Sequence, residues 1–363
     1  MSKIKIAHII CDLLPGGGQR STIDLIKATD DRVENYLILI EDKKTYTPDG
    51  IKIFSLCPNR KKYKKLDIIG DWLLSKKLDN LLKELQIDIA ISHMEATAKV
   101  LRFIDIKKAY YMRVDISHEL GVLKEKSIFR FYKRKLLYQS IFSNQILLCI
   151  SEDAKQNIEK IIKTKDIKTI YNPFNFDKIT KLSNQHIDFV EDNYIIQIGS
   201  GFSRKRQDIL LHAFSKISNK KVKLLLLGTS PYQDAIDLME KLHIKDRVIF
   251  HPFVENPYPY IKKSKLLVIS SEREGLPRVM VEALSLNTPV VSTDCDTGPR
   301  EIMTEELKPY LTLLNNPNDL ANKIDLALEN YPNIEKKYIE KFNITSIRDK
   351  FLLYIKTLLK DYT

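Results

Sequence analysis

The feature that most restricts the fold of this chain is a repeated alternation of short apolar runs with helical patterns. The runs are rich in β-branched side chains, a composition typical of strands buried in a parallel sheet. They occupy Ile4–Ile10, Tyr36–Ile40, Ile51–Phe54, Ile87–Ile91, Ala109–Met112, Ile146–Ile150, Tyr194–Ile198, Val222–Leu227, Val248–Phe250, Lys265–Ser270 and Pro289–Asp294. Strands and helices in this order predict doubly wound α/β structure.

The chain has 363 residues, enough for two domains that each bury a core of their own. We expect one Rossmann-like domain over residues 1–175 and a second over residues 193–340. The polar stretch of residues 176–192 is the expected linker between them. A helix is expected over residues 345–363, returning to the first domain.

One helical pattern of the first domain, Leu66–Leu85, carries Trp72 and several aliphatic side chains. Their spacing predicts an apolar face made of Ile69, Leu73, Leu81 and Leu85. We therefore expect this helix to face the core.

Positive charge is concentrated in the first half of the chain. The formal net charge is +12, and residues 1–180 hold 33 Lys and Arg against 23 Asp and Glu. Basic clusters with interleaved aromatic residues lie at residues 60–65 and 124–135. Such clusters suit nucleic acid, anionic lipid or a phosphorylated acceptor, and a solvated lysine-rich face explains them equally well.

The cysteines and the apolar segments indicate where the protein works. Cys11, Cys57, Cys149 and Cys295 are widely separated and have no histidine neighbours, so neither a disulfide framework nor a zinc site is expected. Neither a leader peptide nor a run of about 18 apolar residues is evident. We expect a cytoplasmic protein, at most peripheral to the cytoplasmic face of the inner membrane.

The stretch Lys265–Leu284 reads as a buried strand, a turn and a helix. Gly275, Leu276 and Pro277 form the turn before a helical pattern that begins near Arg278. A helix N-terminus at the end of a buried strand presents unpaired N–H groups that suit a diphosphate. Glu274 on the turn and Glu282 about one turn into the helix are candidate ligand carboxylates.

A similar arrangement opens the second domain. The run Tyr194–Ile198 leads into Gly199 and then into the paired cations Arg204 and Lys205, before a helix that begins near Asp208. Glycine, cations and a helix N-terminus together predict a diphosphate-binding loop.

The first domain offers weaker candidates. Gly17 and Gly18 follow the first strand and let the backbone approach a ligand closely, with Ser21 as the expected helix cap. The loop lacks G-x-G-x-x-G, so a dinucleotide site is not indicated. His118 follows a later strand in a polar turn, and His93 is its rival after another strand.

These residues resemble the E-x7-E motif of retaining glycosyltransferases with the GT-B fold, most closely glycosyltransferase family 4. Glu274 and Glu282 stand at the two acidic positions, in the family's E-G-x-P…E-A-L context. Gly199, Lys205 and Asp208 match the pattern G-R-x-x-x-x-K-G-x-D. Ser200 departs from that pattern, since the family usually has arginine there, and Arg204 is the candidate replacement.

The resemblance implies two Rossmann-like domains facing across a cleft, with roles for the candidate residues. Glu274 orients the sugar and stabilises developing positive charge, Glu282 holds the ribose, and His118 or His93 touches the sugar. The loop with Gly17 and Gly18 faces the acceptor and the donor diphosphate.

No metal or other cofactor is expected. The single D-x-D, Asp294 to Asp296, lies where the family binds no metal, and we interpret it as chance.

The resemblance also implies the reaction. The expected activity is transfer of a hexose or N-acetylhexosamine from a nucleotide sugar, with UDP the expected nucleotide, to a glycan or lipid-linked acceptor. The expected setting is bacterial surface-polysaccharide biosynthesis, with anionic membrane as a further partner and no nucleic acid. A nucleotide-sugar epimerase of the same fold is the alternative enzyme, and a polyanion-binding protein is the non-enzymatic alternative.

Overall fold

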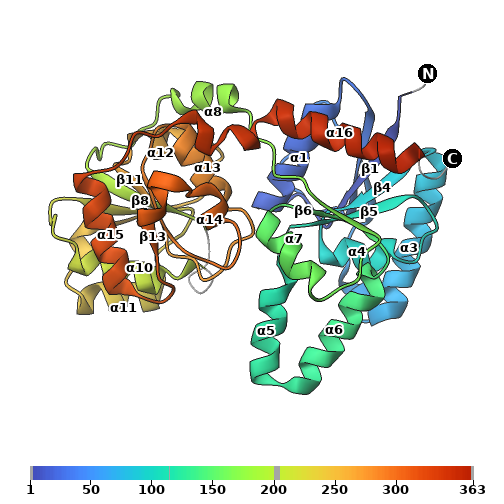
Figure 1. Cartoon of the computed structure of the whole chain (residues 1–363), viewed down its shortest axis with the longest axis horizontal. Coiled ribbons are helices and arrows are strands. Elements are labelled where there is room, and N and C mark those ends of the chain that lie inside the picture. The colour runs from blue at the N-terminus through green and yellow to red at the C-terminus, as the bar shows by residue number, and fades with distance from the viewer. Residues whose placement is uncertain (1–2, 114, 200–204, 361–363) are drawn as a thin grey trace. The chain divides into compact units, whose positions relative to one another are not determined.

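The computed structural model describes residues 3–113, 115–199 and 205–360. The chain divides into two compact units, unit 1 with Met1–Pro173 and Ile344–Thr363, and unit 2 with Phe174–Asn343. Each unit holds one parallel sheet, as the alternation of strands and helices predicted (Figure 1). The predicted GT-B class of α/β fold is confirmed.

Unit 1 has a seven-stranded sheet in the order β3-β2-β1-β4-β5-β6-β7, with every pair parallel. The order reverses between β1 and β4, which are neighbours in space but not in sequence. The strands are β1 (Lys5–Ile10), β2 (Glu34–Glu41), β3 (Lys52–Cys57), β4 (Ile89–Ser92), β5 (Lys108–Met112), β6 (Ile146–Cys149) and β7 (Asp166–Thr169). The helices are α1 (Gly17–Thr29), α2 (Lys61–Lys64), α3 (Asp67–Glu84), α4 (Glu95–Leu101), α5 (Ile116–Lys126), α6 (Ile128–Phe142), α7 (Glu152–Glu159) and α16 (Ile344–Lys360).

Side chains of alternate residues in β1 point to opposite faces of this sheet. Ala7 and Ile9 belong to the larger core cluster, which also holds the buried side chains of α3, α4 and α6. Ile10 belongs to the smaller cluster on the other face, with Ile23 and Ile26 of α1. Helices α3, α4 and α6 therefore cover one face, and α1 covers the other.

The C-terminal helix α16 packs against α1 in unit 1, as predicted for a helix that returns to the first domain. The ring of Phe351 stacks on that of His8, with centroids 6.2 Å apart. Tyr354 donates a 2.6 Å hydrogen bond to Asp166 in β7, and the Lys107 ammonium donates to the carbonyl of Leu359 at 3.1 Å. These contacts tie the end of the chain to both early and late strands of the unit 1 sheet.

Unit 2 has a six-stranded parallel sheet in the order β10-β9-β8-β11-β12-β13, which reverses between β8 and β11. Its strands are β8 (Tyr194–Ile198), β9 (Lys223–Leu227), β10 (Val248–His251), β11 (Leu266–Ile269), β12 (Val290–Thr293) and β13 (Leu311–Thr312). Its helices are α8 (Phe176–Ser183), α10 (Gln207–Lys216), α11 (Gln233–Lys241), α12 (Tyr258–Lys263), α13 (Arg278–Ser285), α14 (Pro299–Ile302) and α15 (Pro317–Glu329), with short 3₁₀ helices at Lys245–Arg247, Glu305–Tyr310, Lys336–Tyr338 and Glu340–Phe342.

The stretch expected to be a linker contains α8, which belongs to unit 2. Asn175 caps this helix by accepting the backbone N–H of Lys178 at 2.9 Å, and Ile179 is buried. The chain therefore passes from one unit to the other at residues 173–174, before the polar stretch, and again at residues 343–344.

The predicted core face of α3 is partly wrong. Leu81 and Leu85 pack against the core, but Ile69 is 58 % exposed, Trp72 45 % and Leu73 38 %. The core is filled instead by a face one position further round the helix, including Leu74, Leu78 and Leu82. Because α3 is apolar on two sides, helical spacing alone could not choose between them.

No helix in the described part of the chain is long and apolar enough to cross a membrane.

Candidate active site

The carboxyl ends of β8 and β11 meet where the unit 2 sheet reverses its strand order. In open α/β sheets, ligands bind beyond the strand ends at such a point. Lys205 follows β8 and Glu274 follows β11, so the topology brings together two residues that are 69 positions apart.

The ammonium of Lys205 and a carboxylate oxygen of Glu274 form an ion pair of 2.7 Å. Their side chains are 13 % and 16 % exposed, so the pair is shielded but not sealed from solvent. The site therefore places a cation and an anion side by side within reach of an incoming ligand, which can take over the contacts of either group.

The backbone of Lys205 is fixed by two polar residues that sequence reasoning missed. Gln197 donates from Nε2 to the carbonyl of Lys205 at 3.1 Å and to the hydroxyl of Ser270 at 2.7 Å. The Ser270 hydroxyl donates in turn to the Lys205 carbonyl at 2.7 Å. Both side chains are buried at the ends of apolar strands. In the sequence, a polar residue at the end of an otherwise apolar strand was the one sign that such a side chain supports the site.

Gly199 leaves the space in which the Lys205 side chain lies. Its φ is +135°, a conformation that favours glycine, and a Cβ there would lie 2.8 Å from Cε of Lys205. The glycine predicted for close approach to a ligand thus also shapes the path of the lysine. Arg204, predicted beside it, lies outside the described residues.

The segment after β12 packs against the turn that carries Glu274 and supports it. The hydroxyl of Thr297 donates to the carbonyl of Glu274 at 2.5 Å. Gly298 has a φ of +88°, and a Cβ there would lie 2.4 Å from the carbonyl oxygen of Gly275. The Gly-Pro pair at residues 298 and 299 therefore supports the turn and also begins α14.

Glu282 occupies a different environment from Glu274. It lies on α13, is 1 % exposed, and is 3.6 Å from the guanidinium of Arg278 one turn earlier. Arg278 stacks over the ring of Phe174 at 4.4 Å. Leu276 and Pro277 are buried between the two glutamates, so the turn enters the helix rigidly. One glutamate is accessible at the turn and the other is enclosed.

The D-x-D residues have separate environments. Asp294 receives a bidentate contact from Arg300, at 3.0 Å from Nε and 2.9 Å from Nη2. Asp296 is exposed. The carboxylate of Asp294 thus has a structural partner in α14.

The corresponding reversal point of unit 1 lies between β1 and β4. Helix α1 begins at Gly17, four residues before the predicted Ser21 cap, because Gly16 supplies the N-cap backbone. Ser21 lies inside the helix and donates to the carbonyl of Gly17 at 2.8 Å. A Cβ on Gly18 would contact Arg113 and Met94 at 3.5 and 3.6 Å, so both side chains lie beside the first turn of α1.

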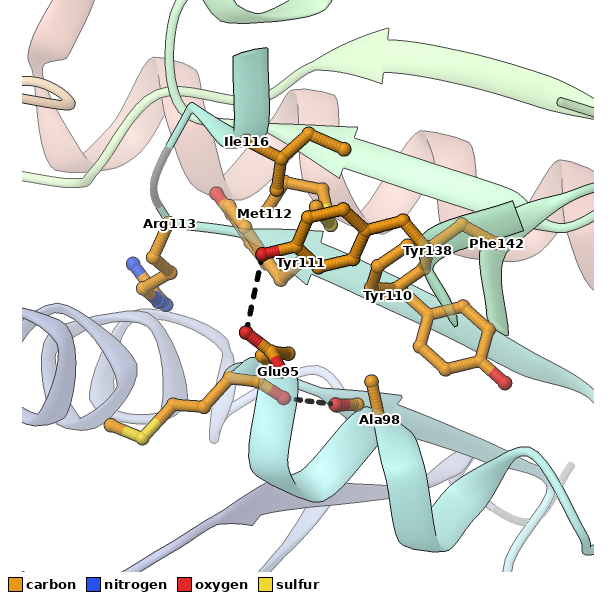
Figure 2. Close-up of a pocket in the computed structure, with 11 residues that line it drawn as sticks. Glu95, Ala98, Tyr110, Tyr111, Met112, Arg113, Ile116, Tyr138 and Phe142 are labelled. Carbon is orange, nitrogen blue, oxygen red and sulfur yellow. Dashed lines mark hydrogen bonds between the residues drawn. The ribbon is translucent and has the colours of Figure 1, made fainter. Parts of the chain in front are cut away.

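Arg113, directly after β5, links several elements of unit 1. It donates to Asn172 at 2.6 Å, to Thr22 at 3.2 Å and to Nδ1 of His93 at 2.8 Å. Arg113 also borders a pocket lined mainly by apolar and aromatic side chains (Figure 2). The volume of this pocket is about 30 Å³. A volume of this size holds about one water molecule, so it is no sugar site.

His93 belongs to a buried chain of hydrogen bonds. Because a guanidinium only donates, Nδ1 of His93 accepts from Arg113, and Nε2 donates to Nδ1 of His8 at 2.9 Å. His8 then donates from Nε2 to Asn35 at 3.1 Å. Burial lowers the pKa of His8 to about 4 and that of His93 well below its usual value. Both rings are therefore neutral, and His93 is enclosed by protein partners.

His118 lies in the first turn of α5, not in a loop, because Asp115 caps the helix by accepting the N–H of Ser117 at 2.8 Å. The ring is partly exposed. Its Nδ1 is buried and has no hydrogen-bond partner among the described residues. His93 is thus hydrogen-bonded to protein at both ring nitrogens, whereas Nδ1 of His118 is buried without a partner among the described residues.

A family model, Glycosyl transferases group 1, matches residues 178–343, almost all of unit 2. Unit 2 of this chain is similar to that family over almost its whole length. We identify the protein as a glycosyltransferase.

Relatives of this glycosyltransferase cover both units. An uncharacterized glycosyltransferase of Methanocaldococcus jannaschii is 29 % identical over 78 % of this chain and 72 % of the relative. A Campylobacter jejuni enzyme, N-acetylgalactosamine-N,N'-diacetylbacillosaminyl-diphospho-undecaprenol 4-alpha-N-acetylgalactosaminyltransferase, is 24 % identical over 97 % of this chain and 99 % of its own.

The fold matches solved structures over the whole chain. The Anabaena protein Alr3699/HepE, solved in complex with UDP and glucose, aligns with a TM-score of 0.75 at 19 % identity. The alignment covers 98 % of this glycosyltransferase and all of that chain. This likeness establishes the two-sheet fold over both units.

Proposed function

We propose that this glycosyltransferase moves a hexose or N-acetylhexosamine from a UDP-sugar to a hydroxyl of a lipid-linked or glycan acceptor, with retention at the anomeric carbon. The observation that carries the proposal is the Lys205–Glu274 ion pair at the reversal point of the unit 2 sheet. The proposal assigns the cation of this pair to the donor diphosphate and its carboxylate to the sugar. The UDP in the related Anabaena structure supports the choice of nucleotide.

Lys205 binds the donor diphosphate in this mechanism, together with Arg204. Negative charge builds on the diphosphate as the glycosidic bond breaks, so a fixed ammonium stabilises the transition state more than the ground state. Gln197 and Ser270 hold the Lys205 backbone, which limits the reorganisation that accompanies the reaction.

Glu274, released from Lys205 by the incoming diphosphate, orients the sugar and stabilises its oxocarbenium-like carbon. Glu282 holds the ribose hydroxyls, and the backbone of Gly275, Leu276 and Pro277 lines the donor site. Retention without an enzyme nucleophile follows from same-face attack, with a donor phosphate oxygen accepting the acceptor proton.

Unit 1 supplies the acceptor side. Gly17 and Gly18 in the first turn of α1 present backbone N–H groups toward a diphosphate, and Arg113 lies beside them. His118, whose ring is partly exposed in the first turn of α5, contacts the transferred sugar. The undecaprenol-linked substrate in the name of the Campylobacter relative favours a lipid-linked acceptor, made for a surface polysaccharide at the cytoplasmic face of the membrane.

The test begins with thermal shift in the presence of UDP, ADP and GDP and then of a panel of UDP-sugars. Stabilisation by UDP above the other two supports the assigned nucleotide. Transfer to a polyprenyl diphosphate-linked acceptor, with the anomeric configuration read by NMR, tests the reaction. Stabilisation by ADP or GDP in preference to UDP, or an inverted product, would refute the proposal. Conversion of the UDP-sugar to its epimer without transfer would instead indicate the alternative enzyme.

A further inference from the structure

The outward face of α3 exposes a group of large apolar side chains. Ile68 is 54 % exposed, Ile69 58 % and Trp72 45 %, and Leu66 just before the helix is 47 % exposed. Their spacing places Ile68, Ile69 and Trp72 on one side of the helix, opposite the buried Leu74 and Leu78. Contiguous apolar surface on a water-exposed helix marks a binding site for another apolar surface.

Lysines surround this apolar group. Residues 60–77 hold seven Lys and Arg against two Asp, and one of those Asp, Asp71, is paired with Arg60. Lys76 lies over the ring of Trp72 at 5.4 Å. Within residues 3–113, 115–199 and 205–360, no ion pair engages the exposed lysines of this segment. They are Lys61, Lys62, Lys64, Lys65, Lys76 and Lys77.

Helix α6 repeats the arrangement. Phe129 is 75 % exposed, Tyr132 56 % and Leu136 64 %, at intervals of three and four residues along one side of the helix. Lys133 and Lys135 flank this stripe in sequence. Residues 124–136 hold six Lys and Arg against one Glu. An exposed apolar stripe bordered by lysines is typical of helices that lie in a membrane interface.

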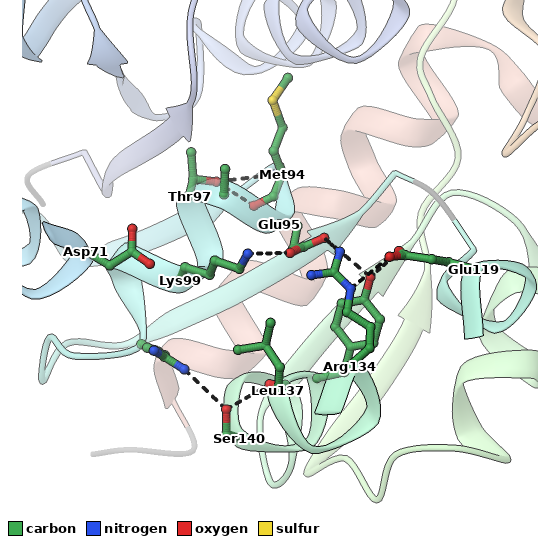
Figure 3. A network of polar contacts seen from close by, with 12 residues as sticks. Asp71, Met94, Glu95, Thr97, Lys99, Glu119, Arg134, Leu137 and Ser140 are labelled. Carbon is green, nitrogen blue, oxygen red and sulfur yellow. Dashed lines mark hydrogen bonds and ion pairs between the residues drawn. The ribbon is translucent and has the colours of Figure 1, made fainter. Parts of the chain in front are cut away.

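Both helices cover the same face of the unit 1 sheet, because the inner sides of α3, α4 and α6 share one core cluster. A polar network fixes α6 in place (Figure 3). Arg134 donates to Glu95 on α4 at 2.6 Å and to Glu119 on α5 at 2.8 Å, and Tyr138 donates to Glu119 at 2.5 Å. Arg134 is thus engaged inward, and the outer stripe is held in a fixed orientation.

We propose that the outer faces of α3 and α6 form the surface through which this glycosyltransferase binds an anionic lipid bilayer. Lysine ammonium groups meet lipid phosphates while Ile69, Trp72 and Phe129 enter the interface. Nucleic acid would satisfy the charges but leave the apolar side chains in water. A second copy would set two positive faces against each other, so charge complementarity favours the bilayer.

The only tryptophan of the chain is a direct probe of this contact. We expect Trp72 emission to shift to shorter wavelength when the full-length protein is mixed with vesicles containing phosphatidylglycerol, and to stay unchanged with pure phosphatidylcholine. Vesicle affinity should fall on going from 50 to 500 mM salt, because screening weakens lysine contacts. Exchange of any two of Lys61, Lys64 and Lys65 for Gln should weaken binding about 25-fold, about fivefold for each lysine.

Sedimentation with vesicles tests the apolar part. Ile69→Glu and Phe129→Glu place a charge on the proposed face at positions that are already exposed, so they should reduce binding at least tenfold with an unchanged melting temperature. Leu353→Glu is the matched control, since Leu353 on α16 is 69 % exposed and α16 packs against α1. This control variant should bind vesicles like the parent protein.

Absence of binding to anionic vesicles at low salt would overturn the inference, as would equal losses in the control and test variants. Concentration-dependent self-association removed by Ile69→Glu, without vesicle binding, would assign the face to a second copy instead. Although a membrane surface fits the lipid-linked acceptor of the proposed function, these assays use no sugar donor. Donor binding measured in parallel therefore shows whether the two proposals fail together or separately.

Discussion

The reversal points of the two sheets are alike in topology and opposite in chemistry. At β8 and β11 in unit 2, the Lys205–Glu274 ion pair stands partly open to solvent. At β1 and β4 in unit 1, the neutral rings of His8 and His93 are fully buried and bonded in series to Arg113. One point keeps charge available for a ligand, whereas the other uses its polar groups to hold its own strands together.

This difference explains why unit 2 could be interpreted from the sequence more fully than unit 1. Charged residues next to glycine and proline at strand ends form a local pattern, and Lys205, Glu274 and Glu282 all belong to one. The histidine chain is not local, because Asn35, His8, His93 and Arg113 come from four different strands or strand ends. Its members meet only through the sheet register, which pairs His8 with Ile91.

The largest effect that tests this contrast is expected at Glu274. Glu274→Gln removes the negative charge that we propose lies nearest the reacting carbon, so kcat should fall about 10²- to 10³-fold. Donor affinity should change much less, because the charge matters most in the transition state. Steady-state kinetics combined with calorimetric donor binding measures the two separately.

Glu282→Gln is the comparison variant for that measurement. Its carboxylate is enclosed in α13, and its proposed contact with the ribose is the same in ground and transition states, so it should chiefly raise the donor KM. If Glu274→Gln only weakened binding and Glu282→Gln only slowed the chemistry, the two roles would have to be exchanged.

The next largest effect is expected at Lys205. Lys205→Ala should weaken donor binding by about 1.5–3 kcal/mol, the cost of losing a hydrogen bond to a charged group. Lys223→Ala is a matched control, because Lys223 also pairs with a carboxylate, Glu191, but lies at the start of β9. Calorimetry with UDP should separate the two variants, and equal affinities would remove Lys205 from the donor site.

For unit 1, we expect pH to affect the stability of the fold and not the binding of the donor. The pKa of His8 is lowered to about 4 from a usual 6.5, so the unfolded chain binds more protons than the folded one below pH 6.5. Stability should therefore fall as the pH drops, by about 1.5 kcal/mol from His8 alone between pH 6.5 and pH 5. His93, lowered for the same reason, should add to this loss.

Denaturant unfolding followed by Trp72 fluorescence reports on unit 1, which holds the only tryptophan. Histidine ring NMR at pH 5 provides the direct check, with His8 and His93 expected to carry the proton on Nε2. A stability that stays constant over this range, or an Nδ1–H tautomer at His93, would contradict the hydrogen-bond chain.

The parallel sheets and eleven of the strands followed from apolar runs, and the accessible charges followed from motifs. Two kinds of feature could not be predicted from the sequence. The short strand β13 (Leu311–Thr312) is stabilised by its place beside β12 and has no periodicity of its own. The outward face of α3 was mistaken for the core, because burial of a doubly apolar helix depends on what packs against it. The charge of a loop is evident from the local sequence, whereas the element that packs against a helix face is not.

The smallest expected effect concerns metal ions. Activity should be unchanged by EDTA, because Lys205, Arg204 and the helix N-termini are proposed to offset the diphosphate charge that a divalent ion would otherwise meet. Asp294, the first residue of the only D-x-D, is held by two contacts from Arg300 and would have to leave them to bind an ion. Asp294→Asn should therefore lower the melting temperature slightly and leave the donor KM unchanged. Loss of activity on chelation, restored by Mg²⁺ or Mn²⁺, would contradict this, and loss of that metal response in Asp294→Asn would then identify Asp294 as a ligand.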